Sequence, residues 1–300
     1  MVLRGKIVDL FEFLFIVQLL ISGLLAGSLY ALLACGLNLV FGVMRIINVA
    51  HAELMLVGAY LAYVLYAFLG IHPLISLILV APVLFGMGWL LQRILIERVV
   101  GQHELSSLIL TYGLSIVLMN LGLAIFSADF KSIPVLQGSF LIGDLVTIPK
   151  SRGMAGLVAV TITLTVYLFL KQTRLGKAIR ATSEHPKVAE ICGIDVVRVR
   201  MLTFGLATAM AGMAGIMLST IFSFSPETGG EFILKCFAII IIGGMGSFSG
   251  AFIGAIVLGV AEALVAGFAS TQWSETVAYA LLVFVLLIRP TGLRGVARTP

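Results

Sequence analysis

Residues 171–200 read KQTRLGKAIRATSEHPKVAEICGIDVVRVR and form the one long polar interruption in an apolar chain. Of the 300 residues, 60% are hydrophobic and 11% are charged, and the mean hydropathy is +1.15. These values lie far outside the range of water-soluble domains. The composition therefore predicts an integral membrane protein, and the polar interruption predicts a segment that lies outside the bilayer.

Apolar runs on both sides of this segment have close to the length, about 20 residues, that crosses a bilayer as a helix. They lack the strict alternation of outer-membrane strands. We expect an all-α, polytopic helical bundle of eight to ten transmembrane helices, forming a single domain over residues 1–300. The candidate spans are 11–27, 28–43, 54–70, 74–92, 105–127, 153–170, 201–223, 232–244, 251–268 and 276–289.

Two parts of this pattern are ambiguous. The runs 11–27 and 28–43 are barely separated, and residues 243–250 (GGMGSFSG) interrupt the region 232–268. Either pair could be one long helix or a re-entrant hairpin. We also expect a break near residues 42–53, so that the bundle has two glycine-interrupted or re-entrant regions.

Charge placement predicts the sidedness of the loops. With ten crossings and both termini cytoplasmic, fifteen of the nineteen Lys and Arg residues fall on the inner side. Lys131, Lys150 and Arg152 are the exceptions in outer loops. Because the basic residues cluster beside apolar spans, we expect contact with membrane lipid and no binding of nucleic acid.

The segment 171–200 carries seven basic and three acidic residues, which is most of the net charge of +5. Pro186 suits the first position of a helix, Gly193 suits the position after its end, and Asp195 suits a helix cap. We therefore expect two short helices here. Helices of fewer than about 12 residues need packing to be stable. They could pack on their own bundle, on the lipid surface or on a partner protein.

Three blocks, in order along most of the chain, resemble the permeases of branched-chain amino-acid ABC transporters. The quoted matches are residues 27–53 (GSLYALLACGLNLVFGVMRIINVAHAE) with 58–60, residues 173–181 (TRLGKAIRA) with 189 and 193–194, and residues 243–247 (GGMGS) with 250–251 and 259–262. The first block and the short N-terminus are similar to the LivH type rather than the longer LivM type. Ala52 departs from the glycine that is usual in the family.

The resemblance implies a permease subunit of an ATP-binding-cassette importer in a bacterial or archaeal cytoplasmic (inner) membrane. Such a subunit forms half of a pathway for branched-chain amino acids. It implies as partners two ABC ATPase subunits, a second, LivM-type permease and an external solute-binding protein. A sister branch of the superfamily carries urea or short amides, which these motifs do not exclude.

Within this resemblance, residues 171–200 correspond to the cytoplasmic loop that couples the permease to its ATPases. The expected coupling residues are Arg174, Gly176, Lys177, Arg180, Glu184, Ala189 and Gly193.

Polar residues inside spans are costly and are often functional, and interrupted helices often line a transport pathway or act as hinges. The expected pathway or hinge residues are Asn38, Asn48, His51, Glu53, Gly243, Gly244, Gly246, Ser247 and Glu262. Alternatively, His51 and Glu53 cap a break in the helix, and Glu262 forms a salt bridge or hydrogen bond to another helix. We expect Lys235 to reach the membrane interface without a function.

Enzyme motifs do not occur in the sequence. It has no phosphate-binding GxxxxGK[ST] motif and no HExxH, and no histidine follows the GSFSG of residues 246–250. We expect no catalytic residue, metal site or cofactor, so ATP hydrolysis would take place on separate subunits. The rival hypotheses are an ion-coupled secondary transporter, with Glu262 or Glu53 as the coupling site, and a passive channel. A docking loop for ATPases favours the importer.

Overall fold

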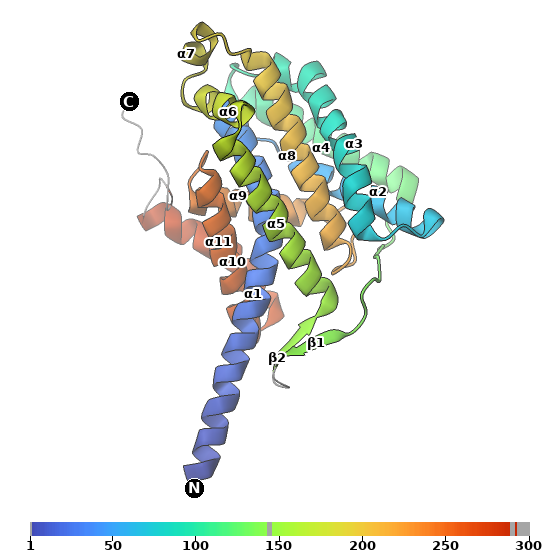
Figure 1. The fold of residues 1–300 in the computed structure, drawn as a ribbon, viewed down its shortest axis with the longest axis vertical. Helices are drawn as coiled ribbons and strands as arrows, with labels where there is room; N and C mark the ends of the chain where they lie inside the picture. Colours follow the sequence, from blue (N-terminus) through green and yellow to red (C-terminus); the bar gives the residue numbers. More distant parts are fainter. Residues whose placement is uncertain (1, 143–145, 289–291, 293–300) are drawn as a thin grey trace.

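The computed structural model of the protein describes residues 2–142, 146–288 and 292. In this part of the chain there are eleven α-helices, one short 3-10 helix and one two-stranded antiparallel hairpin (Figure 1). Eight of the described helices are long and apolar enough to cross a bilayer. The predicted all-α membrane bundle is therefore confirmed.

The first half of the chain supplies four long helices before the hairpin. Gly70, with φ of +65°, ends α2, and Pro73 opens α3 in the first helical position. The elements are α1 (Val2–Met44), α2 (His51–Leu69), α3 (Pro73–Ile94), η1 (Ile96–Arg98), α4 (Glu104–Phe126), β1 (Ser139–Ile142) and β2 (Val146–Pro149).

The second half contains the short polar helices between long apolar ones. As predicted, Pro186 opens one of them, Gly193 follows its end with φ of +82°, and Asp195 caps the next helix by accepting a hydrogen bond from the Arg198 amide at 3.0 Å. The elements are α5 (Lys150–Gln172), α6 (Arg174–Glu184), α7 (Pro186–Ile191), α8 (Val196–Leu218), α9 (Gly229–Gly243), α10 (Phe248–Phe268) and α11 (Thr271–Ile288).

Helix α1 is continuous over 43 residues, so of the alternatives for 11–27 and 28–43 the single long helix is the one that forms. The small residues near its middle form a packing surface instead of a turn. A Cβ atom added to Gly23 would lie 2.6 Å from the Val260 Cα of α10, and one added to Gly27 would lie 2.9 Å from the Ala255 carbonyl oxygen. The glycines let the α1 and α10 backbones touch.

Helix α9 has only 15 residues, and it is too short to cross a bilayer alone. At 1.5 Å per residue it spans about 22 Å, against a hydrocarbon core of about 30 Å. Residues 244–247 separate it from α10. The predicted glycine interruption in this region is confirmed, and it divides two helices of unequal length.

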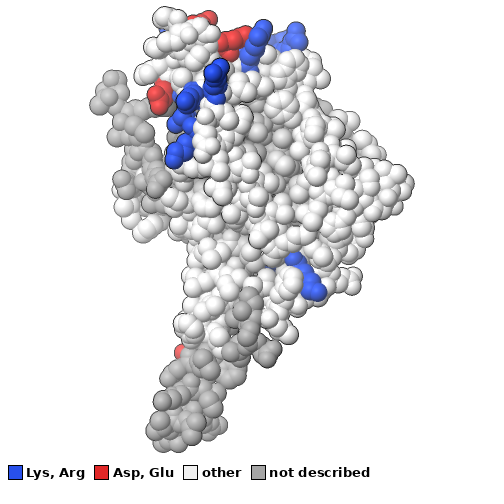
Figure 2. Space-filling model, viewed as in Figure 1, with Lys and Arg blue, Asp and Glu red and all other residues white. Residues whose placement is uncertain are grey.

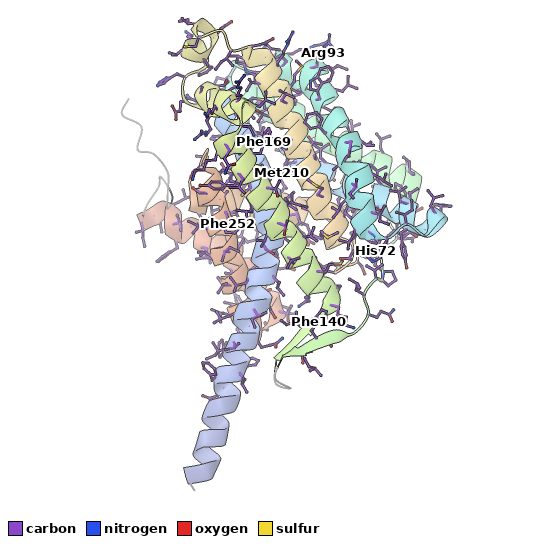
Figure 3. The ribbon with its side chains drawn as sticks, in the orientation of Figure 1. His72, Arg93, Phe140, Phe169, Met210 and Phe252 are labelled. Carbon is purple, nitrogen blue, oxygen red and sulfur yellow. The ribbon has the colours of Figure 1, made fainter. Side chains whose placement is uncertain are left out.

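Helix α8 is the central helix of the bundle. In its most apolar stretch 83% of the residues are buried, against 6% in α4 and in α11. It packs on α1, α2 and α3. A side chain at Gly58 of α2 would collide with the Gly212 backbone of α8, and one at Gly212 would collide with the Leu84 side chain of α3. Met210 of α8 is fully buried among these helices (Figure 3).

The two ends of the bundle differ in charge. Met44 ends α1 beside α6, whereas the start of α1 lies at the opposite end (Figure 1). Figure 2 shows Lys and Arg side chains gathered over the α6 end of the visible face, with one further group toward the other end. Arg93 lies at the α6 end of α3 and His72 at its other end (Figure 3).

The continuous α1 also changes the expected topology. The expected topology with both termini on one side counted ten crossings, whereas eight of the described helices are long and apolar enough to cross a bilayer. The start of α1 lies at the end of the molecule away from α6 (Figure 1), whereas Gly292, just after α11, lies against the Gly244 backbone between α9 and α10.

Candidate functional site

The chain turns back into the bundle between α1 and α2. We call residues 45–50 the first break. The first residue of α2 is His51, whose Nε2 lies 3.0 Å from the carbonyl oxygen of Leu33 in α1. Leu33 is eleven residues, or about 16 Å, before the end of α1. Helix α2 therefore begins beside α1 within the bundle, and the predicted break is confirmed.

Polar side chains at this break are deeply buried. Asn48 is 0% exposed and His51 is 1% exposed. Among the described residues, the side-chain amide of Asn48 and the Nδ1 atom of His51 have no hydrogen-bond partner. Buried polar atoms without a protein partner are uncommon, and either a functional role or an ordered water accounts for them. Both residues remain candidates for the pathway.

Glu53 lies in the first turn of α2 and joins three helices. Its carboxylate accepts a hydrogen bond from the Ser115 hydroxyl of α4 at 3.3 Å. It also faces the start of α9, where a Cβ atom added to Gly229 would lie 2.5 Å from its Oε1. A carboxylate is favourable near helix N-termini. Glu53 thus links α2 to α4 beside the start of α9, and within the part of the chain that the structure describes no side-chain hydrogen bond caps the first turn of α2 or of α9.

The second break comprises residues 244–247, between α9 and α10. Gly244 and Gly246 have φ of +101° and +84°, a backbone conformation that favours glycine. One side chain of α1 satisfies this backbone: Asn38 Oδ1 accepts from the Gly246 amide at 2.7 Å, and Asn38 Nδ2 donates to the Ser247 carbonyl at 2.7 Å. Irregular backbone at membrane depth requires such partners. Asn38, Gly244, Gly246 and Ser247 thus form one structural unit.

Two further contacts fix the ends of this break. The Ser247 hydroxyl accepts a hydrogen bond from the Gly250 amide at 3.1 Å and so caps α10. Gly243 packs directly on the Gly250 backbone, with no room for a side chain at either position. Each glycine and serine predicted in this region therefore has a defined local role.

Helix α6 contacts α1 and faces the second break across a small cavity. The Ser183 hydroxyl of α6 donates a hydrogen bond to the Gly42 carbonyl of α1 at 2.9 Å. A Cβ atom added to Gly42 would lie 3.4 Å from Gly246. A cavity of about 240 Å³ separates α6 from the break, with Asn38, Arg180 and Ser183 in its lining. The predicted coupling and hinge residues are therefore neighbours, which the sequence did not indicate.

Glu262 of α10 forms the centre of a second polar cluster. Its Oε2 accepts a hydrogen bond from the Tyr30 hydroxyl at 2.9 Å. Its Oε1 lies 3.1 Å from the Lys235 ammonium, as an ion pair without hydrogen-bond alignment. The side chains of Lys235 and Glu262 are only 18% and 10% exposed.

The prediction for Lys235 is therefore wrong: its ammonium stays within the bundle because Glu262 is within reach. The salt-bridge alternative for Glu262 is confirmed. Tyr30, which belongs to the quoted GSLYA block, was not predicted as a site residue.

The amino-acid sequence of the chain matches a known protein family. The model of the branched-chain amino acid transport system / permease component family matches residues 19–286. The chain belongs to this family.

Individual relatives agree with this assignment. The permease is 34% identical to the high-affinity branched-chain amino acid transport system permease protein LivH of Salmonella typhimurium, over 95% of this chain and 97% of that protein. It is 34% identical to the permease protein BraD of Pseudomonas aeruginosa, over 93% and 95% of the two chains. Similarity to the S. typhimurium permease protein LivM is 29% over 48% of this chain and 34% of that protein. The LivH-type resemblance is confirmed.

The coupling residues predicted for the permease fall into two groups in the structure. Arg174, Lys177, Arg180 and Glu184 are exposed on α6. Gly176 and Ala189 are buried, and Gly193 is an exposed left-handed turn residue. A Cβ atom at Gly176 would lie 2.5 Å from the Leu170 Cα, so this glycine seats α6 on α5. The exposed charged residues are accessible to a partner protein, whereas Gly176, Ala189 and Gly193 determine how α6 and α7 fold and pack.

Apolar side chains are exposed on the same element. Ile191 of α7 is 86% exposed and Val188 is 55% exposed. Both lie in a polar segment, so the charge pattern of the sequence drew attention away from them. Exposed apolar residues rimmed by charged ones are typical of protein interaction sites. The structure thus adds Val188 and Ile191 to the candidate coupling surface of the permease.

Proposed function

We propose that this chain is a permease subunit of an ATP-binding-cassette importer and forms half of a pathway for branched-chain amino acids. The observation that carries this proposal is the position of α6. Its inner side contacts α1 and faces the second break across a small cavity, and its outer side presents charged residues beside exposed Val188 and Ile191. Such an element can receive a force from a separate protein. We place it in a bacterial or archaeal cytoplasmic membrane, as the family membership supports.

The orientation follows from this role. The α6 end faces the cytoplasm, where most of the basic residues gather, in agreement with the positive-inside rule (Figure 2). The end of α11 then lies on the cytoplasmic side and the start of α1 lies outside. This arrangement replaces the expected topology with both termini inside.

Separate proteins complete the transporter. Two ABC ATPases hydrolyse the ATP, because the chain has no phosphate-binding motif of its own. Helices α6 and α7 form the surface on which this subunit contacts the ATPases. A second, LivM-type permease forms the other half of the pathway; the partial similarity to LivM supports a related partner. An external solute-binding protein delivers the solute at the opposite end.

Transmission from the ATPases begins at α6. A movement of α6 displaces Gly42 through the hydrogen bond from Ser183 to the Gly42 carbonyl, and Gly42 lies against Gly246. Asn38 forms hydrogen bonds with Gly246 and with the neighbouring Ser247. Left-handed glycines at 244 and 246 make this break a suitable hinge between α9 and α10. The opening of the pathway is thereby linked to the ATPase cycle.

The test is co-purification and uptake with the neighbouring genes expressed together. Ile191→Asp and Arg180→Glu should reduce both the recovery of ATPase subunits with this chain and ATP-dependent uptake of L-leucine. Lys150→Glu, at the opposite end, is the matched control. Uptake by vesicles that contain this chain alone, driven by an ion gradient, would refute the proposal in favour of a secondary transporter.

A further inference from the structure

A cavity of about 420 Å³ lies at the end of the bundle away from α6. Its lining includes early residues of α1, the end of α10, and the first turns of α5 and α11. Small-molecule sites in proteins usually measure about 300–1,000 Å³. In the proposed orientation this cavity lies in the half of the bundle from which an imported solute arrives.

Four charged side chains line this cavity. Lys235 and Glu262 form the buried ion pair beside Tyr30. Arg152 at the start of α5 and Glu275 at the start of α11 are exposed to the cavity. The guanidinium of Arg152 lies over the Phe222 ring, 5.8 Å from its centroid. Neither Arg152 nor Glu275 forms an ion pair with another residue that the structure describes.

The charge balance restricts the ligand. Two cations and two carboxylates give a neutral lining, so an anion or a cation alone would leave one pair of side chains without a partner. Leaving a charge unpaired in a partly desolvated site is costly. A zwitterion supplies one partner of each sign, and charge-assisted hydrogen bonds to both are strong. An uncharged solute such as urea or an amide supplies neither.

The remaining wall of the cavity is apolar. Leu19, Leu25 and Leu29 project from α1, and Ala263 and Ala266 line the α10 side. This wall has room for an aliphatic group because the facing residues of α10 are small. The charged side chains, whose charges sum to zero, match the zwitterionic end of an aliphatic amino acid, and the apolar wall matches its side chain.

We propose that this cavity binds aliphatic α-amino acids as zwitterions, with Arg152 holding the α-carboxylate and Glu275 the α-ammonium. The Lys235–Glu262 pair provides a second set of charges deeper in the bundle, on the way toward the second break. The inference rests on the proposed function only in assigning the direction of entry. It identifies the permease itself, in addition to any binding protein, as a point of solute selection.

The test measures binding to the purified full-length chain in lipid nanodiscs, with L-leucine as the probe. Leucinamide lacks the carboxylate, 4-methylpentanoate lacks the ammonium and 4-methylpentanamide lacks both charges. We expect competition against labelled leucine by isoleucine and valine, and at least about tenfold weaker competition by each of the three analogues, because each loses a charge-assisted hydrogen bond.

Arg152→Gln and Glu275→Gln should each weaken leucine binding by about tenfold, for the same physical reason. Lys150→Gln and Glu231→Gln are matched controls, since both residues lie outside the cavity lining; they should leave binding within about twofold of the wild type. All four positions are surface positions, and an unchanged size-exclusion profile verifies folding.

Absence of leucine binding, equal competition by 4-methylpentanamide, or indifference to Arg152→Gln and Glu275→Gln would each overturn the inference. ATP-dependent leucine uptake by the wild-type complex is measured in parallel. If uptake is normal while binding to the cavity fails these tests, the inference is wrong and the proposed function stands. If the binding measurements give the expected results but leucine uptake does not depend on ATP, the proposed function is wrong and the binding site stands.

Discussion

The hydroxyl of Ser183 donates to the carbonyl oxygen of Gly42 at 2.9 Å, so that α6 is joined to the last turns of α1. Because Gly42 also lies against Gly246, this hydrogen bond connects the exposed polar element to the break between α9 and α10.

Ser183→Ala removes that connection. The net loss of one hydrogen bond is about 0.5–1.5 kcal/mol, so the permease should still fold. ATPase subunits should still co-purify, because the exposed docking residues are untouched, but leucine uptake per ATP hydrolysed should fall. Thr165→Val is the control, since Thr165 donates only to its own helix, at Thr161. An unchanged ratio of uptake to ATP hydrolysis in Ser183→Ala would exclude transmission through this contact.

Asn38→Ala should destabilise the permease itself. The substitution leaves the Gly246 amide without a partner, at a cost of about 1–3 kcal/mol for this buried group. The Ser247 carbonyl loses the bond from Asn38 but keeps the one from the Ala251 amide. Thermal unfolding in detergent should therefore occur at a clearly lower temperature. Equal stability of the alanine variant and the wild type would show that the break needs no support from α1.

Gly246→Ala tests the backbone of the second break. At φ of +84° an L-residue is strained, and the expected loss of stability is about 1–2 kcal/mol. Gly86→Ala in α3 is the control, because nothing lies within 4 Å of the added atom and its φ is ordinary. That variant should be neutral or slightly stabilising. Thermal unfolding of the two variants side by side gives the answer, and a Gly246→Ala protein as stable as Gly86→Ala would contradict the assigned strain.

The Lys235–Glu262 pair should show strong coupling in a double-mutant cycle. Removal of one partner, as in Lys235→Met or Glu262→Ala, leaves a buried charge uncompensated and should cost about 3–5 kcal/mol. Glu262→Gln should be milder because it can still accept from Tyr30. The double variant Lys235→Met with Glu262→Gln should recover much of the loss. If the losses of the single variants simply add, the two side chains do not act as a pair.

Much of the bundle could be predicted because apolar length and glycine position carry the information. The break at residues 244–247 and the caps at Pro186, Gly193 and Asp195 follow from local backbone chemistry. The continuity of α1 could not be predicted, since glycines in a membrane helix permit either a turn or a close helix contact. Only the position of α10 decides between the two.

The candidate sites show the same limit. Asn38, Glu53 and Glu262 were predicted because polar residues in spans are rare, yet their partners lie far away in the sequence. Asn38 and Ser247 are separated by 209 positions, and Tyr30 and Glu262 by 232. Lys235 was assigned to the interface because its distance to Glu262 depends on how α9 and α10 pack. Tertiary packing, which one sequence does not reveal, determined which polar residues act together.

The glycines at the contact between α1 and α10 bring the two backbones so close that there is no free space between them. Gly23, Gly27 and Gly259 bring main-chain atoms into direct contact, so neither helix can slide without the other. The two helices are therefore expected to move as one rigid unit, with α6 near one end of it and the cavity that Arg152 and Glu275 line near the other. A small tilt imposed at the α6 end must then reappear as a displacement of the cavity wall.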